Sequence, residues 1–323
     1  MSLITPKAQE SQINWKLISI VTPTYNEAEN VDRLYERICA ATKSQDKYKF
    51  EIIFIDNKST DETVKKVKRL ATIDQSVKLI VNTRNFGHIR SPYYGILQAH
   101  GQAVIYLASD LQDPPELIGR FISEWEQGYK VVCAVKPTSQ NTWLMHKIRR
   151  LYYRVLSAIS ETKLTRDTTG FGLYDQTVVN QLRQVGDPYP YLRGLIDELG
   201  YEIKTIDFEQ PRRLKGNTKN NIYSLYDIAM LAFVSHSKIP LRLAAILGFG
   251  VGFTSIIFGI YFITRKLLSW DSFQLGVAPM LVGMFFLGGI QLIFLGIVGE
   301  YVGVILQYVR KRPIVVEEER INF

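Results

Sequence analysis

The apolar and polar residues of this chain follow two contrasting patterns, which divide it into a long amino-terminal part and a shorter carboxy-terminal part. From Lys16 to Gln210, short β-branched apolar runs alternate with longer mixed segments, which is typical of repeated strand–helix units and a largely parallel sheet. Two uncharged apolar runs follow, Leu243–Ile263 and Gly276–Gly299. Each exceeds the roughly 18 residues that a membrane-spanning helix needs. The pattern predicts an α/β head joined to an α-helical, two-span membrane hairpin.

Five apolar runs in the amino-terminal part are candidates for the strands of the sheet. They are Leu17–Thr22, Phe50–Ile55, Val77–Val81, Ala103–Leu107 and Val131–Val135. Apolar residues at helical spacing predict helices at Asn30–Thr42 and Asp61–Ala71, and we expect Asp61 to cap the second helix. A segment of about 200 residues suits one doubly wound, Rossmann-like domain.

Polar turns follow the first four predicted strands. They are Pro23–Glu27, Asp56–Asp61, Arg84–Gly87 and Ser109–Glu116. A single residue of this kind is as often a cap or a turn residue, but the carboxyl ends of parallel strands meet at one sheet edge, where ligands bind. Neither GxGxxG nor GxxxxGK[ST] follows any strand. A nucleotide at this edge would therefore be held by side chains and a metal ion.

The charges indicate a membrane surface rather than nucleic acid as the partner. The net charge is +8, but the cations are scattered or lie beside the apolar runs. Five cations flank the outer ends of the two runs, and two lie in the loop between them. The positive-inside rule then predicts a multi-pass protein of the inner (plasma) membrane, with the head and both termini in the cytoplasm. Residues 1–15 lack the apolar core of a signal peptide.

The segment before the first apolar run has a basic loop and an amphipathic stripe. The stripe consists of Ile222, Leu225, Tyr226, Ala229, Met230 and Phe233, which fits an interfacial helix, although a core helix would show the same spacing. We therefore divide the chain into a head (1–210), a basic loop with an interfacial helix (211–237), two membrane helices (238–312) and a cytoplasmic tail (313–323). Small-residue pairs such as Gly248/Gly252 could pack the hairpin on itself or join protomers, and we favour a homo-oligomer because two helices alone make a thin bundle.

The turn motifs resemble those of the inverting family 2 glycosyltransferases, whose catalytic domains have the GT-A fold. The matching segments are Val21–Glu27, Ile55–Asp61, Arg84–Gly87, Asp110–Glu116 and Thr169–Phe171. Their order, together with the paired apolar runs, is similar to that of polyprenyl-phosphate glycosyltransferases. These include bacterial enzymes that glucosylate undecaprenyl phosphate for O-antigen modification of lipopolysaccharide and, more distantly, dolichyl-phosphate mannose synthases. The resemblance covers nearly the whole chain.

The resemblance implies a donor pocket and a metal site at the predicted sheet edge. The nucleotide would contact Pro23, Tyr25, Glu27, Asp56, Asn57 and Asn85. Asp110, the last carboxylate of the family's DxD motif, would ligate Mg²⁺ or Mn²⁺ together with Gln112. Ala108 stands where the first Asp is expected, so metal affinity should be weaker, although one or two carboxylates plus diphosphate oxygens can hold such an ion.

On the acceptor side, the resemblance implies a carboxylate and a cluster of cations. Asp167 would position the acceptor or donor, with base catalysis or a plain turn role as alternatives. Because Gly172 stands where many relatives have an arginine, the acceptor phosphate would be bound mainly by a basic loop. This loop consists of Arg212, Arg213, Lys215 and Lys219. The same cations could instead bind lipid headgroups.

The resemblance thus implies metal-dependent transfer of a hexose, with inversion, from a nucleotide sugar to undecaprenyl phosphate at the cytoplasmic membrane face. Glucose from UDP-glucose is the first choice, and GDP-mannose, UDP-GlcNAc and UDP-aminoarabinose fit the same motifs. A processive polysaccharide synthase is disfavoured because no QxxRW motif is present. A non-catalytic membrane scaffold is supported by Ala108 and opposed by Asp110, Gln112 and Asp167.

Overall fold

The computed structural model describes residues 16–136, 168–187, 190–209, 239–268, 277–310 and 312–323. The chain divides into two compact units. We call the first, Met1–Gln140 with Thr165–Thr218 and Arg312–Phe323, the head. The second, Asn141–Leu164 with Lys219–Lys311, is the helical unit.

All five predicted strands are present in the head, with ends within two residues of the expected positions. They are β1 (Lys16–Thr24), β2 (Tyr48–Asp56), β3 (Val77–Asn82), β4 (Ala103–Tyr106) and β5 (Val131–Val135). Three further strands were not expected from the pattern: β6 (Thr168–Asp175), β7 (Ile203–Asp207) and β8 (Glu317–Ile321). The last of these lies in the segment that we expected to be a tail.

The eight described strands form one sheet in the order β7-β5-β6-β4-β1-β2-β3-β8. Four pairings are parallel, and the three that involve β6 or β8 are antiparallel. The α/β architecture with a mostly parallel sheet is therefore as predicted. The strand order reverses at β1, since β2 and β3 extend to one side of it and β4 lies on the other.

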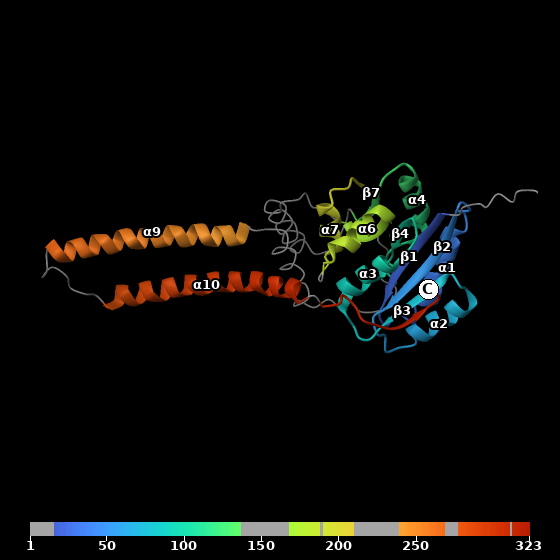
Figure 1. The fold of residues 1–323 in the computed structure, drawn as a ribbon, viewed down its shortest axis with the longest axis horizontal. Helices are drawn as coiled ribbons and strands as arrows, with labels where there is room; N and C mark the ends of the chain where they lie inside the picture. Colours follow the sequence, from blue (N-terminus) through green and yellow to red (C-terminus); the bar gives the residue numbers. More distant parts are fainter. Residues whose placement is uncertain (1–15, 137–167, 188–189, 210–238, 269–276, 311) are drawn as a thin grey trace, which may run out of the picture. The chain divides into compact units, whose positions relative to one another are not determined.

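Helices cover both faces of the sheet, as Figure 1 shows. They are α1 (Val31–Thr42), α2 (Thr63–Ile73), α3 (Gly87–Gln98), α4 (Ile118–Glu126), α6 (Gln176–Val185) and α7 (Leu192–Glu198). Side chains of α1, α2 and α4 belong to one buried cluster, and those of α3, α6 and α7 belong to a second. Because successive strand residues point to opposite faces, Ile52 and Phe54 enter the first cluster, whereas Ile53 and Ile55 enter the second.

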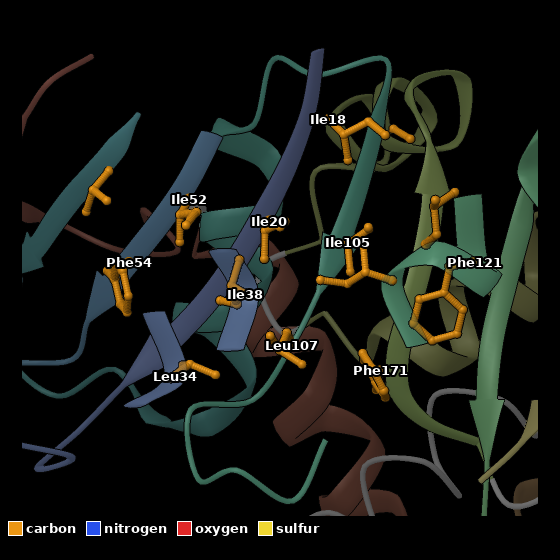
Figure 2. Close-up of a cluster of buried hydrophobic side chains, with 14 of the residues drawn as sticks. Ile18, Ile20, Leu34, Ile38, Ile52, Phe54, Ile105, Leu107, Phe121 and Phe171 are labelled. Atoms are coloured by element: carbon orange, nitrogen blue, oxygen red, sulfur yellow. The ribbon is translucent and has the colours of Figure 1, made fainter. Parts of the chain in front are cut away.

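The first cluster is shown in Figure 2. Ile20 of β1 lies beside Ile38 of α1 there, and Ile18, Ile20, Leu34 and Ile38 have no exposed surface. Phe171 of β6 packs edge-on against Phe121, with ring centroids 4.9 Å apart. The buried apolar stripe of α1 is therefore what the helical spacing in the sequence predicted.

The start of α2 differs by one residue from the prediction. The N-cap is Glu62, not Asp61. The Asp61 carboxylate still serves the helix start, because its Oδ1 accepts from the Thr63 backbone N–H at 3.0 Å and its Oδ2 accepts from the Ala28 N–H at 3.2 Å. Asp61 thus ties the turn after β1 to the first turn of α2.

The helical unit contains α9 (Ile239–Leu268), which includes the first predicted apolar run, and α10 (Val277–Val309), which includes the second run except its first residue, Gly276. Large apolar side chains on them are exposed, among them Phe249 at 80% and Leu292 at 70%. Within the described residues one stretch, Phe286–Leu306, is long and apolar enough to cross a membrane, and Ala244–Thr254 forms a shorter apolar stretch. The predicted two-span hairpin is therefore not confirmed and remains a prediction.

Candidate functional site

The candidate site is the sheet edge where β1, β2, β3 and β4 end. The predicted polar turns all follow these carboxyl ends. The reversal of strand order at β1 lies between β4 and β2, and ligands of open α/β sheets bind at such a switch point. The fold therefore brings together the turns that the sequence pattern singled out.

Unusual backbone conformations are concentrated in these turns. Asn26 after β1, Lys58 after β2 and Leu111 after β4 have positive φ angles of 55°, 64° and 61°. Such angles are unfavourable for residues with side chains and persist only where surrounding contacts enforce them. Hydrogen bonds within and between the turns hold these conformations in place.

Asp56, the last residue of β2, is completely buried and holds two of the turns together. Its Oδ2 accepts from the Thr24 hydroxyl at 3.0 Å, and its Oδ1 accepts from the Ser59 N–H at 2.7 Å. Burial raises the pKa of the Asp56 carboxyl above its usual range, although the bonds from Ser59 and Thr24 act in the opposite direction. Asp56 therefore links the turn after β1 to the turn after β2, between which the predicted donor pocket lies.

The turn after β1 is fixed against the turn after β2. The Asn26 Oδ1 accepts from the Thr60 N–H at 2.8 Å, and the Asn26 N–H donates to the Ser59 Oγ at 2.9 Å. The Glu27 carboxylate accepts from the Asn30 amide at 2.6 Å. Tyr25 is partly exposed between these anchored residues. Pro23, Tyr25 and Glu27 thus lie on a rigid turn beside the predicted donor pocket.

Asn57 organises the turn after β3. Its Nδ2 donates to the Asn85 Oδ1 at 2.8 Å and to the Gly87 carbonyl at 3.1 Å. Its Oδ1 accepts from the Phe86 N–H at 2.8 Å and from the Asn82 amide at 3.2 Å. The Asn57 amide is therefore fully engaged with the protein, whereas Asn85 is exposed at the surface.

The turn after β4 carries the predicted metal ligands. The Asp110 Oδ1 accepts from the Gln112 N–H at 3.1 Å, so the turn folds around this carboxylate. The Ser109 hydroxyl donates to the Pro23 carbonyl at 2.7 Å, which joins the turn to the end of β1. Asp110 and Gln112 are both partly exposed. The turn thus brings Asp110 to the edge where the Pro23–Glu27 turn begins.

Asp113 is a second carboxylate of this turn, and the sequence analysis missed it. It is 5% exposed, and its Oδ2 accepts from the Ala108 N–H at 3.1 Å. Burial raises the pKa of the Asp113 carboxyl to about 7, and the nearby charge of Asp110 contributes. Its place within the Asp110–Glu116 motif was the available signal, since the resemblance covered the motif but only Asp110 and Gln112 were selected.

The donor set of this turn fits a hard divalent cation in part. Within the described residues no three His, Cys, Asp or Glu side chains gather as a metal cluster. Two carboxylates close enough to repel each other are still compatible with an ion that takes its remaining ligands from diphosphate oxygens and water. Ala108, where the resemblance led us to expect a carboxylate, is instead a backbone partner of Asp113.

The structure shows why Gly172 cannot be an arginine in this chain. A Cβ atom at Gly172 would lie 2.3 Å from the Val132 carbonyl oxygen of the neighbouring strand, which is a severe overlap. Arg193 of α7 lies nearby, since a Cβ atom at Gly170 would be 3.9 Å from its Nε. The charge of Arg193 acts to lower the pKa of the Asp113 carboxyl. Arg193 is thus a cation near the site that the sequence analysis missed.

Several predicted residues lie outside the part of the chain that the structure describes. They are Asp167, Arg212, Arg213, Lys215, Lys219 and the stripe of the expected interfacial helix. Their roles remain predictions.

Comparison with known proteins gives a consistent result. A sequence model described as glycosyl transferase family 2 matches residues 19–183. An uncharacterized glycosyltransferase of Synechocystis is 33% identical over 298 residues, which cover 92% of this chain and 93% of that protein. A prophage bactoprenol glucosyl transferase homolog of Escherichia coli K12 is 30% identical, and a bactoprenol glucosyl transferase of Shigella phage SfII is 31% identical. Both alignments cover 92% of this chain and 96% of the relative.

Proposed function

Since the chain belongs to glycosyl transferase family 2, we propose that it transfers glucose from UDP-glucose to undecaprenyl phosphate at the cytoplasmic face of the membrane. Two relatives that align with nearly their whole length carry the name bactoprenol glucosyl transferase, which supports a polyprenyl phosphate acceptor and glucose as the sugar. The mostly parallel sheet with helices on both faces fits the GT-A architecture. The apolar stretch Phe286–Leu306 suits an enzyme whose acceptor is a membrane lipid.

The observation that carries this proposal is the joining of three turns at the switch point of the sheet. Ser109, next to Asp110, is bonded to Pro23, and Asp56 is bonded to Thr24. The candidate metal ligand therefore shares one rigid edge with the candidate nucleotide pocket. A nucleotide diphosphate bound between the turns would have its sugar–phosphate bond beside Asp110.

Asp110 and Gln112 would hold a Mg²⁺ or Mn²⁺ ion, and the buried Asp113 would support the turn that carries them. Such an ion supplies positive charge that stabilises the departing nucleoside diphosphate. Asp113 fixes the turn through the Ala108 N–H, so it would orient Asp110. The tether from Ser109 to Pro23 would keep the turn from moving as negative charge builds up on the leaving group.

The acceptor phosphate is already an anion at neutral pH, so the chain mainly has to position it for in-line attack, with inversion at the sugar carbon. We assign this positioning to Asp167 and to the basic loop Arg212, Arg213, Lys215 and Lys219. Charge-assisted bonds from Arg and Lys to phosphate are strong, which supports a role for the loop. This part of the proposal rests on the resemblance of the motifs.

The topology of the chain supports two membrane crossings. Strand β7, which ends at Asp207, and strand β8, which begins at Glu317, belong to the same sheet. A chain that starts and ends on one side of a membrane crosses it an even number of times. If Phe286–Leu306 crosses, a second segment between β7 and β8 must cross as well. Helix α9 has 30 residues, about 45 Å at the usual rise, which is sufficient.

Homo-oligomerisation remains part of the proposal. A Cβ atom at Gly248, Gly252, Gly299 or Gly303 would meet nothing within 4 Å, so there is room for another helix to approach closely. Cross-linking of the detergent-solubilised protein measures this directly.

The test of the proposed function is transfer of label from a panel of nucleotide sugars to undecaprenyl phosphate in detergent, with Mn²⁺ or with EDTA. Metal-dependent, organic-extractable label from UDP-glucose alone is the expected result. Label from GDP-mannose, UDP-GlcNAc or UDP-aminoarabinose would keep the reaction and replace the donor. If no donor gives label, a non-catalytic membrane scaffold would be the better hypothesis, and Ala108 would be explained as the loss of a metal ligand.

A further inference from the structure

The segment after α10 is part of the head and not a free tail. Strand β8 pairs antiparallel with β3, from Leu79 opposite Ile321 to Asn82 opposite Glu317. In Figure 1 the C-terminal segment, drawn in red, runs along the edge of the sheet beside β3. The Thr83 N–H also donates to the Val316 carbonyl at 3.0 Å. The chain therefore returns from α10 to the strand that precedes the Arg84–Gly87 turn.

The far end of this segment is firmly anchored. The Asn322 amide donates to the carbonyls of Ala71 and Val77, both at 2.8 Å. The Phe323 ring lies under two cations, 4.9 Å from the Lys78 Nζ and 4.5 Å from the Arg320 guanidinium carbon. These contacts fix the register of β8, and with it the positions of its acidic side chains.

Two consecutive glutamates of β8 form ion pairs with different parts of the head. Glu319 pairs with Lys68 of α2 at 2.5 Å. Glu318 pairs with Lys58, which follows directly after Asp56 and Asn57 in the turn after β2. The two pairs are similar in chemistry and exposure, with Lys58 and Glu318 at 44% and 47% and Lys68 and Glu319 at 41% and 43%. Of these two, only the Lys58–Glu318 pair reaches the candidate site.

Lys58 is a sensitive point of that turn. Its φ of 64° lies in the left-handed region, which side chains other than glycine rarely adopt. It separates Asn57, which holds the turn after β3, from Ser59, which bonds to both Asp56 and Asn26. A change in the backbone at Lys58 would therefore be transmitted to both sides of the proposed donor pocket.

We propose that Glu318 is a positioning residue for the nucleotide pocket, which acts by holding Lys58 and hence the Asn57–Ser59 turn in the shape that binds the donor. The inference rests on the proposed function, because it takes this turn to be part of the donor site. Residues 310–317 alone separate Glu318 from the end of α10. The segment that follows the last apolar helix thus helps to set donor affinity.

The test measures binding of UDP to the full-length protein in detergent with Mn²⁺ by calorimetry, together with KM and kcat for UDP-glucose. Glu318→Lys and Lys58→Glu are each expected to weaken UDP binding and to raise KM about two- to fivefold, because the pair is exposed and its contribution is small. We expect kcat to change little. The charge-swapped double variant Lys58→Glu/Glu318→Lys should recover most of the lost affinity.

The pair Lys68–Glu319 supplies the matched control. Glu319→Lys removes an ion pair of the same strand, so it should lower the thermal unfolding midpoint as much as Glu318→Lys but leave UDP affinity unchanged. Equal UDP affinities of Glu318→Lys and Glu319→Lys, or a double variant without recovery, would overturn the inference. Wild-type protein that binds neither UDP nor GDP would instead overturn the proposed function, and this inference with it.

Discussion

The head and the helical unit are built from the same apolar amino acids but expose them in opposite ways. Ile20 and Phe54 have no exposed surface in the head, whereas Phe249 and Leu292 of the helical unit are 80% and 70% exposed. Burial from water stabilises the head. A helix that is apolar on all sides is stable where a protein core or a lipid bilayer takes the place of water, and Phe286–Leu306 is long and apolar enough to cross a bilayer. The comparison teaches that the same kinds of apolar side chain form a closed core in the head and an exposed surface on the helices of the other unit.

The same substitution in the two units should have very different costs. Phe171 is completely buried and packs against Phe121 and Phe208, so Phe171→Ala is expected to lower the free energy of unfolding by about 3–5 kcal/mol. Phe286 is 66% exposed, so Phe286→Ala should cost less than about 1 kcal/mol in detergent. Denaturant titration followed by tryptophan fluorescence measures both. Equal costs would mean that Phe286 is packed in a protein core.

Within the head, loss of the candidate metal ligand should reduce turnover far more than loss of an exposed carboxylate elsewhere. Asp110→Asn removes the charge of the candidate metal ligand and is expected to reduce transfer by about 10²- to 10³-fold without loss of stability. Asp46→Asn, at an exposed position before the start of β2 and so at the opposite end of that strand from the candidate turn, is the control and should keep full activity. Activity is measured with labelled donor under saturating Mn²⁺. Unchanged turnover of Asp110→Asn would remove this residue from the reaction.

A charged side chain at an exposed apolar position should be tolerated in the head, where water surrounds it, but not in Phe286–Leu306 if lipid surrounds it. Leu295, 66% exposed near the centre of Phe286–Leu306, would face lipid, so Leu295→Arg should cost about 2.5–3.5 kcal/mol of insertion free energy. Ile73 at the end of α2 is 77% exposed, and Ile73→Arg should have almost no effect. Resistance to alkaline extraction from membranes gives the readout. Full resistance of Leu295→Arg would argue that this face does not contact lipid.

Replacing a glycine by alanine should lower stability at Gly172 in the head but not at Gly288 in the helical unit. At Gly172 it would lie 2.3 Å from the Val132 carbonyl oxygen, so Gly172→Ala is expected to cost about 1–3 kcal/mol. At Gly288 it would meet nothing within 4 Å, and Gly288→Ala should be close to neutral. Thermal unfolding of the two variants side by side checks this. A destabilised Gly288→Ala protein would indicate a helix packed against that glycine.

Local sequence patterns predicted the centre of the head well. Strands β1 to β5 are buried on both faces, so they appear in the sequence as short apolar runs whose limits are marked by polar turns. Helix α1 has its buried residues Val31, Leu34 and Ile38 at helical spacing. The carboxyl ends of parallel strands meet at one edge whatever the loops do, so the position of the candidate site followed from the strand assignment.

Contacts between distant segments could not be predicted in this way. Glu318 and Lys58 are 260 positions apart, and nothing near either residue indicates the other. The acidic segment Glu317–Glu319 has the composition of a solvated tail. It becomes a strand because the edge of β3 offers backbone partners and because Lys58 and Lys68 lie within reach. Asp113 was missed for a related reason, since its burial depends on packing around the turn after β4.

The sequence by itself determined the division into a head and an apolar helical part, the strands at the centre of the sheet and the turns that form the candidate site, because all of these depend on residues close together in the chain. The tertiary structure alone decided that the last strand adds to the edge of the sheet beside β3, that Gly172 has no room for a side chain, and that Asp56 and Asn57 bond the candidate turns together. These features depend on backbone approach and burial between segments far apart, where distance and geometry, rather than local pattern, set the energy.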